Sequence, residues 1–117
     1  MKIQKTIEKL ASRIRFCLFR DTNQISYLEA KEMMQSHPNT ILLDVRSKQE
    51  YDEYHLDGAI CVPTYEIERI IPKMIENKTQ IIICYCQTGS RSKKASILLK
   101  KMGYTDVYEM DGGIDNM

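Results

Sequence analysis

Several features that would place this chain outside the globular class are scarce or absent. Its 117 residues include no Trp, only five Gly and only three Pro, and 43% of them are hydrophobic. This composition excludes a collagen-like, low-complexity or wholly disordered chain. Its apolar runs, such as residues 81–86, have the length of a strand and fall far short of the roughly 18 residues of a membrane span. We therefore expect a folded domain with its own core and no segment that crosses a bilayer.

Cysteine and strong net charge are also limited. Four Cys are too few for a disulfide framework, and their spacing matches neither the C-x2-C pairs nor the His spacing of a zinc site. We therefore expect reduced thiols, a cytoplasmic location and no metal centre. The net charge of +1 is uneven, since residues 1–20 carry six Lys and Arg against one Glu, whereas acidic residues outnumber basic ones over residues 21–117. A negatively charged main body predicts that nucleic acid is not a principal partner.

The first residues combine positive charge with a helical spacing of apolar side chains. These recur every three or four positions, at Ile3, Ile7, Leu10, Ile14 and Cys17. The spacing predicts a basic amphipathic helix over residues 3–19. Charged residues interrupt any signal-like apolar stretch, so we do not expect export. We expect a helical extension, 1–23, and a domain, 24–117. The extension either covers the domain or contacts a partner or an anionic surface through residues 1–20.

From residue 25 onward, short strand signals alternate with helix signals, which is the pattern of an α/β domain. Two capping boxes, Ser26 with Glu29 and Ser47 with Glu50, predict the starts of two helices. We predict a mostly parallel central sheet of about five strands flanked by helices. Strands are expected near residues 41–45, 59–62, 81–85 and 105–110, and helices near residues 27–36, 48–54, 65–71 (interrupted by Pro72) and 90–102.

The join between the strand at 81–85 and the next helix reads Cys86-Gln87-Thr88-Gly89-Ser90-Arg91. In an open α/β sheet, ligands bind beyond the carboxyl ends of the strands, and this loop brings a cysteine there. The free N–H groups and the dipole of a helix N-terminus favour an anion, which predicts a lowered pKa and a nucleophilic thiolate. Gly89 allows the loop to turn, and the hydroxyls of Thr88 and Ser90 add hydrogen-bond donors. Arg91 supplies a forked cation for an oxyanion.

Four short motifs follow one another in a fixed order. They are Asp44-Val45-Arg46 with Glu50-Tyr51, His55-Leu56-Asp57-Gly58-Ala59-Ile60 with Pro63, Tyr85-Cys86-x-x-Gly89-x-Arg91-Ser92, and Gly103-Tyr104 followed by Gly112-Gly113. Each motif is weak alone, but the four together resemble the single-domain rhodaneses, a sulfurtransferase family, over residues 24 to about 114. The resemblance implies a rhodanese-like fold in which Cys86 carries the transferred sulfur.

The resemblance also implies a ping-pong reaction. A Cys86 thiolate takes the outer sulfur of a small anionic donor such as thiosulfate, becomes a persulfide, and passes the sulfur to cyanide or to a thiol. The substrate-binding residues are expected to be Gln87, Thr88, Gly89, Ser90 and Arg91. Their amides would cradle the sulfur, and Arg91 would hold the departing sulfonate. No metal or organic cofactor is expected, because sulfur is itself the redox-active group.

Residues around the loop are expected to support it. The resemblance implies that Asp44 and Arg46 brace the loop through hydrogen bonds and an Arg46–Glu50 pair, with Ser92 also in a supporting position. Cys84 and Cys61 are interpreted as packing residues, and whether either takes part in the reaction stays open. The family often places a Trp after the double glycine, and its absence here predicts a less firmly held C-terminal end.

Two alternative functions stay open. Related phosphatases and arsenate reductases use a C-x5-R loop that wraps a tetrahedral oxyanion. The spacing from Cys86 to Arg91 is C-x4-R, one residue shorter, which favours a single sulfur atom over phosphate. The other alternative is a non-catalytic regulatory or sulfur-relay module, and the presence of both residues counts against it.

Overall fold

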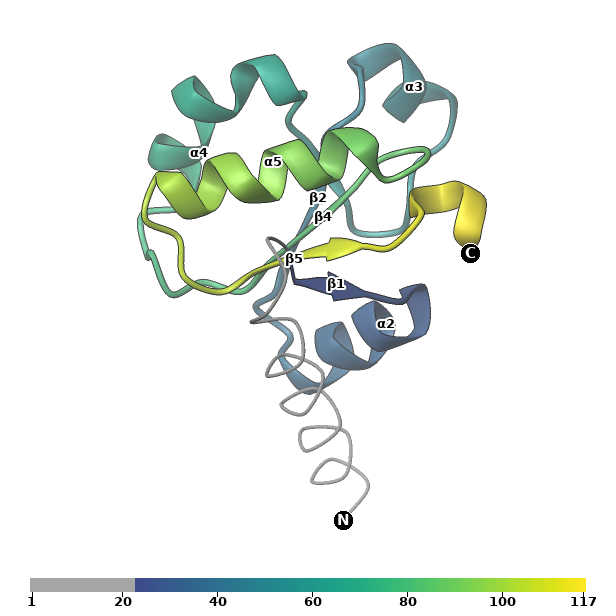
Figure 1. Cartoon of the computed structure of the whole chain (residues 1–117), viewed down its shortest axis with the longest axis horizontal. Coiled ribbons are helices and arrows are strands. Elements are labelled where there is room, and N and C mark those ends of the chain that lie inside the picture. The colour runs from purple at the N-terminus through teal and green to yellow at the C-terminus, as the bar shows by residue number, and fades with distance from the viewer. Residues whose placement is uncertain (1–22) are drawn as a thin grey trace.

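The computed structural model describes residues 23–117, which fold into a parallel sheet with helices on both faces (Figure 1). The sheet has the strand order β1-β5-β4-β2-β3, and each neighbouring pair is parallel. The strands are β1 (Gln24–Ile25), β2 (Ile41–Asp44), β3 (Ile60–Cys61), β4 (Ile82–Tyr85) and β5 (Val107–Met110). The helices are α2 (Tyr27–Ser36), α3 (Lys48–Glu53), α4 (Ile67–Met74) and α5 (Ser90–Lys101), with 3-10 turns η1 (Thr64–Glu66) and η2 (Gly113–Asn116).

The predicted fold class is confirmed: the domain is α/β with a five-stranded parallel sheet. The predicted helix over residues 3–19 lies outside the described residues. Among the helices of residues 23–117, none has the length and apolar character needed to span a membrane.

Successive side chains of β4 point to opposite faces of the sheet, as expected of a strand buried on both sides. Ile82 and Cys84, followed by Cys86, belong to the core under α4 and α5, whereas Ile83 and Tyr85 belong to the core against α2. Figure 1 shows the same layers, with α4 and α5 on one side of the sheet and α2 on the other. The alternation directs the Cys86 side chain toward α5.

Most element boundaries lie within two residues of the prediction, but α4 differs. The predicted helix stops at Pro72, whereas α4 continues through it to Met74 and follows the short turn η1. Burial of Ile67, Ile71 and Ile75 along one side holds this helix against the sheet. Pro72 lies on the exposed side, where water can satisfy the carbonyl group that loses its partner.

Strand β1 was not among the predicted strands, because two residues carry no periodic signal. It exists through tertiary pairing, since Gln24 and Ile25 lie in register with Glu109 and Met110 of β5.

A buried hydrogen-bond chain joins β4 to β2. The Tyr85 hydroxyl donates to Asp44 Oδ2 at 2.8 Å and accepts from the Leu56 N–H at 3.0 Å. Both Tyr85 and Asp44 are 0% exposed. Burial raises the pKa of the Tyr85 phenol, so the hydroxyl keeps its proton and remains a donor. Tyr85, the residue directly before Cys86, is therefore anchored on the face of the sheet opposite to the Cys86 side chain.

Replacing Tyr85 with Phe tests this anchor. We expect the free energy of unfolding to fall by about 1–3 kcal/mol, because Leu56 N–H and one Asp44 oxygen lose a buried partner. Urea denaturation measures the change. Tyr65→Phe, at a side chain that is 80% exposed, is the matched control and should stay within about 0.5 kcal/mol of the parent. Equal stability of the Y85F variant and the parent would contradict the anchoring role.

Candidate active site

Cys86 lies directly after β4, and α5 begins four residues later with Gly89 as its N-cap. Gly89 has a φ of 103°, in the left-handed region that favours glycine, and this turn directs its N–H back toward the cysteine. The sulfur accepts hydrogen bonds from Gly89 N–H at 3.1 Å and from Ser92 N–H at 3.4 Å. The first turn of α5 thus directs its unpaired N–H groups at one sulfur atom.

Burial and hydrogen bonding act on the Cys86 thiol in opposite directions. Cys86 is 0% exposed, and this burial by itself raises the pKa. Hydrogen bonds from the Ser92 hydroxyl and from the backbone N–H groups of Ser92, Gly89 and Arg91 outweigh burial, so the pKa lies below its ordinary value. Without these hydrogen bonds, a buried cysteine would stay protonated and unreactive. The lowered pKa means that, at a given pH, a larger fraction of Cys86 is thiolate than for an ordinary cysteine.

Ser92 has two hydrogen-bonding choices next to this sulfur. The Ser92 hydroxyl donates to the Gly89 carbonyl at 3.1 Å, and the Cys86 thiol donates to Ser92 Oγ at 3.5 Å. When the thiol loses its proton, rotation of the hydroxyl lets it donate to the sulfur instead. Ser92 is fully buried, so no water competes for this position. The predicted supporting residue therefore contacts the sulfur directly.

Arg91 points its guanidinium at Glu50 rather than into open space. Arg91 Nη1 donates to Glu50 Oε1 at 2.6 Å, and Nη2 donates to Oε2 at 3.0 Å. Glu50 belongs to the capping box of α3 and was predicted to pair with Arg46. That prediction is wrong, because the guanidinium of Arg46 is occupied by Asp44.

Arg46 connects the buried Asp44 carboxylate to the loop. Arg46 Nε and Nη2 donate to the Asp44 carboxylate at 3.0 and 2.7 Å, and both residues are buried. Arg46 Nη1 also donates to the side-chain oxygen of Gln87 at 3.3 Å. Gln87 therefore directs its side chain away from the sulfur and ties the loop to the end of β2.

The C-terminal turn η2 holds the other side of the loop. Ile114 N–H donates to the Cys86 carbonyl and Asp115 N–H to the Gln87 carbonyl, both at 3.0 Å. The Gln87 amide donates to Asp115 Oδ1 at 2.6 Å. These hydrogen bonds tie the C-terminal end to the loop, whereas the expectation that this end is held less firmly than in relatives with a Trp stays a prediction. Sequence reasoning included Tyr85 in a motif without giving it a role, and it missed Asp115, near which only the double glycine was noted.

The remaining predicted residues lie farther from the sulfur. Thr88 and Ser90 are exposed, and their hydroxyls contact each other at 3.5 Å. Cys84 is buried within β4 and burial raises its pKa, in agreement with a packing role. Burial also raises the pKa of Cys61, whose sulfur contacts the Arg46 carbonyl at 3.8 Å. Within the described residues, Cys86 is the only cysteine whose pKa is lowered.

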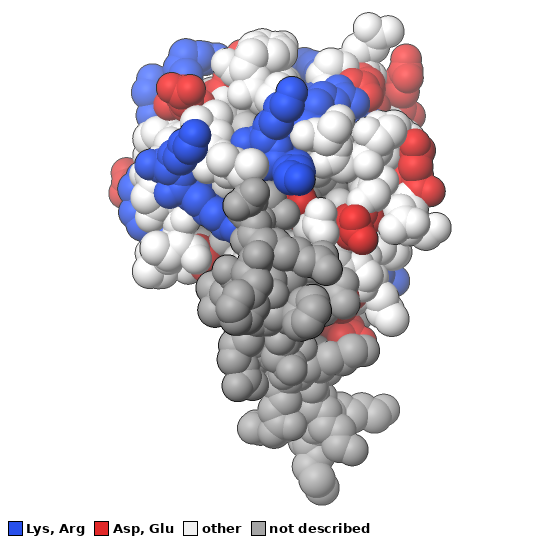
Figure 2. Space-filling model, in the orientation of Figure 1, with Lys and Arg blue, Asp and Glu red and all other residues white. Residues whose placement is uncertain are grey.

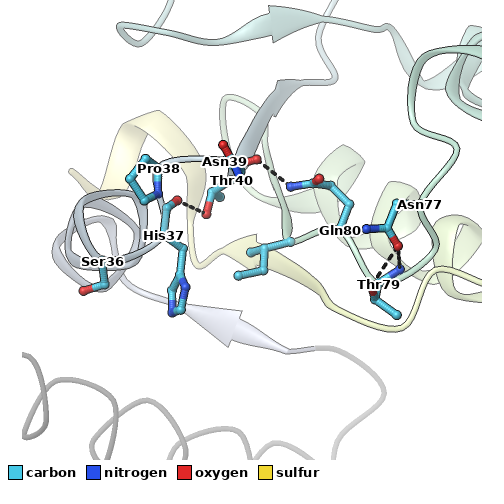
Figure 3. Close-up of a pocket in the computed structure, with 9 residues that line it drawn as sticks. Ser36, His37, Pro38, Asn39, Thr40, Asn77, Thr79 and Gln80 are labelled. Atoms are coloured by element: carbon cyan, nitrogen blue, oxygen red, sulfur yellow. Dashed lines mark hydrogen bonds between the residues drawn. The ribbon is translucent and has the colours of Figure 1, made fainter.

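The site lies at the carboxyl edge of the sheet, and a separate pocket lies at the amino edge (Figure 3). This pocket has a volume of about 270 Å³, and the loops that precede β2 and β4 line it, including His37, Asn39, Asn77 and Gln80. Its lining is mostly polar and uncharged, and it lies at the opposite ends of the strands from Cys86.

A cysteine-bearing loop between a strand and a helix, at the carboxyl edge of a parallel sheet, defines a class of α/β domain in which a thiolate can act as a nucleophile. The family model for the Rhodanese-like domain matches residues 26–117, and the chain belongs to that family. A solved structure described as a rhodanese with anions from E. coli is 33% identical, with a TM-score of 0.61, over 67% of this chain and 91% of that chain.

The curated relatives are longer than this chain. The tRNA uridine(34) hydroxylase of Protochlamydia amoebophila is 40% identical over an alignment 107 positions long, which covers 82% of this chain and 33% of that protein. The Escherichia coli O81 protein of the same name is 32% identical over an alignment 120 positions long, which covers 97% of this chain and 34% of that protein. The chain spans about a third of these relatives.

Replacing Ser92 with Ala tests the sulfur cradle. Loss of the hydroxyl should raise the pKa of Cys86, because one hydrogen bond that stabilises the thiolate disappears. We expect alkylation of Cys86 at neutral pH to slow about two- to tenfold. Site-resolved mass spectrometry measures the rate. Ser96→Ala is the matched control, since Ser96 is buried one turn later and its hydroxyl donates to the Lys93 carbonyl at 2.9 Å. Equal rates for both variants would argue against a role for Ser92.

Replacing Gly113 with Ala tests the contact of η2 with the loop. Gly113 has a φ of 64°, and a Cβ there would overlap the Cys86 carbonyl and lie 2.7 Å from the Gln87 carbonyl oxygen. We expect a loss of about 3 kcal/mol or more in unfolding free energy. Gly58→Ala has a similar positive φ with nothing within 4 Å, so it should lose only about 1–2 kcal/mol. Equal losses of unfolding free energy in the two variants, measured by thermal unfolding, would contradict the close approach of Gly113 to the Cys86 and Gln87 carbonyls.

Proposed function

We propose that this chain is a sulfurtransferase domain in which Cys86 accepts a sulfane sulfur and passes it to a thiophilic acceptor. The observation that supports this most strongly is the buried Cys86 sulfur with N–H groups of Gly89 and Ser92 directed at it. This arrangement favours a small anionic atom, either the thiolate or the outer sulfur of a persulfide. Membership of the rhodanese-like family supports the same chemistry.

In the first step, the Cys86 thiolate attacks the outer sulfur of a donor such as thiosulfate. A sulfur–sulfur bond forms to Cys86, the sulfur–sulfur bond within the donor breaks, and sulfite leaves with the electron pair. The negative charge moves from the thiolate to the departing sulfite. The loop amides from Gln87 to Arg91 then lie around the persulfide and stabilise its outer sulfur.

Arg91 assists the departing group at the rim of the site. Each of its terminal nitrogens gives one hydrogen to Glu50, which leaves further N–H groups of the guanidinium for a sulfonate oxygen. The predicted sulfonate contact therefore does not require the ion pair to open.

In the second step, a nucleophile such as cyanide or a thiol attacks the outer sulfur of the persulfide, and the Cys86 thiolate leaves. The enzyme returns to its starting state, so the kinetics are ping-pong. The cycle uses no metal or organic cofactor. It requires a reduced Cys86, and for this reason we propose a reducing, cytoplasmic location.

The two alternatives fit the site less well. A phosphatase loop needs donors spaced for a tetrahedral oxyanion, whereas the C-x4-R loop closes directly on the sulfur through Gly89 and Ser92. A non-catalytic module would have no use for a Cys86 pKa that is lowered despite full burial.

A second candidate function comes from the curated relatives. Because the relatives reported above are named tRNA uridine(34) hydroxylases, we also propose that this domain serves an enzyme that modifies RNA, contrary to the expectation that nucleic acid is not a principal partner. A mobility-shift titration of the chain with tRNA, over a range of salt concentrations, tests direct contact. Saturable binding that weakens with salt supports this second function. Absence of binding at micromolar concentrations would contradict direct contact by this chain.

Replacing Cys86 with Ser tests the proposed chemistry. We expect the parent to convert thiosulfate and cyanide to sulfite and thiocyanate, and the C86S variant to lose this activity completely, because the serine hydroxyl is a far weaker nucleophile toward sulfur. Mass spectrometry after thiosulfate treatment should find an adduct of about 32 Da on Cys86 that a thiol removes.

Cys84→Ser is the matched control, since Cys84 lies two residues earlier on the same face of β4. It should keep the adduct and the activity of the folded parent. Activity on an aryl phosphate in place of thiosulfate would overturn the proposal in favour of a phosphatase. Absence of both activities, with no adduct on Cys86, would favour the non-catalytic module.

A further inference from the structure

The ion pair between Arg91 and Glu50 stands at the rim of the site. The side chains are 38% and 33% exposed, so an entering donor meets both of them. Arg91 lies in the first turn of α5, where its charge adds to the positive end of the helix dipole. Figure 2 shows Lys and Arg side chains gathered over the part of the surface where α4 and α5 lie. A cation that served only to attract anions would gain nothing from a full counter-charge beside it.

Glu50 is held in place from both sides. Its Oε1 accepts hydrogen bonds from the N–H and the hydroxyl of Ser47, at 3.2 and 3.1 Å, in the capping box of α3. The same carboxylate receives both terminal nitrogens of Arg91. The hydrogen bond from Arg91 lowers the pKa of Glu50 to about 2, so the carboxylate stays charged near neutral pH. The guanidinium therefore has a fixed position and a permanent counter-charge.

The charge of Arg91 acts on the sulfur as well as on the donor. The hydrogen bond to Glu50 is the largest cause of the raised pKa of Arg91, and the negative charge of Cys86 raises this pKa further, so the Cys86 and Arg91 charges attract each other. A carboxylate bound to Arg91 opposes part of this attraction. Glu50 thus acts on the site through Arg91. It reduces the attraction of the site for negative charge although its hydrogen bonds go to Arg91 and not to the sulfur.

We infer that Glu50 sets the charge selectivity of the Cys86 site: by fixing Arg91 and cancelling part of its charge, it favours neutral or weakly charged sulfur donors, such as organic persulfides, over dianions such as thiosulfate. The inference rests on the proposed function and narrows its substrate class. Glu50 is a positioning residue, since it acts through Arg91.

Glu50→Gln removes the negative charge and, because an amide nitrogen cannot accept, one of the two hydrogen bonds from Arg91. Gln at this position of a capping box keeps the hydrogen bond to the helix start. Glu53→Gln is the matched control, since it removes one negative charge from the same short helix at an exposed side chain. The E50Q variant should lower KM for thiosulfate about two- to fivefold with little change in kcat, the size expected of one partly exposed charge interaction. The E53Q variant should leave KM within experimental error.

A second readout does not depend on sulfur transfer. Iodoacetate and iodoacetamide are similar in size and differ by one negative charge, so the ratio of their alkylation rates at Cys86 reports the local potential. Site-resolved mass spectrometry separates Cys86 from the other cysteines. The E50Q variant should raise the ratio of iodoacetate to iodoacetamide about two- to fivefold, whereas E53Q should leave it unchanged.

The outcomes separate this inference from the proposed function. An unchanged ratio in the E50Q variant, an equal change in both variants, or equal slowing of both reagents would overturn the charge-selectivity inference. A raised ratio in a protein that forms no persulfide would support the electrostatic role of Glu50 and refute the sulfurtransferase proposal.

Discussion

The hydrogen bonds from Gly89 and Ser92 to the Cys86 sulfur constrain the rest of the site. A fully buried thiol normally resists ionisation, since water no longer stabilises its charge. The first turn of α5 replaces water with fixed N–H donors, which need no reorganisation when charge develops. The site consequently combines exclusion of solvent with a lowered pKa. The contacts described below hold the loop so that the N–H groups of Gly89 and Ser92 stay within hydrogen-bonding distance of the Cys86 sulfur.

Two structural supports hold the loop from different parts of the chain. On one side, the buried Asp44–Arg46 pair reaches Gln87 from the end of β2. On the other, the turn η2 donates backbone hydrogen bonds to the carbonyls of Cys86 and Gln87. Gln87 joins the two supports, because its amide oxygen accepts from Arg46 and its nitrogen donates to Asp115. The Cys86 loop is therefore joined by hydrogen bonds to two segments that lie far from it in the sequence.

Local sequence patterns predicted most of the helices and strands and the position of Cys86 between a strand and a helix, but they did not predict the long-range partners. The capping boxes at Ser26 and Ser47 identified two helix starts correctly, because capping is decided within four residues. Cys86 was identified by its place between a strand and a helix. The partner of Glu50 was predicted wrongly, since Arg46 and Arg91 are equally plausible from spacing and only the fold decides between them. Strand β1 and the contacts of Asp115 likewise depend on tertiary pairing.

The most direct test of this account is the pKa of the Cys86 thiol in the folded parent protein, measured from the pH dependence of its alkylation rate with a neutral reagent. The account predicts a midpoint below the ~8.5 of an unperturbed cysteine, because the donors of Gly89 and Ser92 outweigh burial. A midpoint at or above that value would mean that burial dominates. Cys86 would then be an ordinary packing residue, and the proposed chemistry would lack its nucleophile.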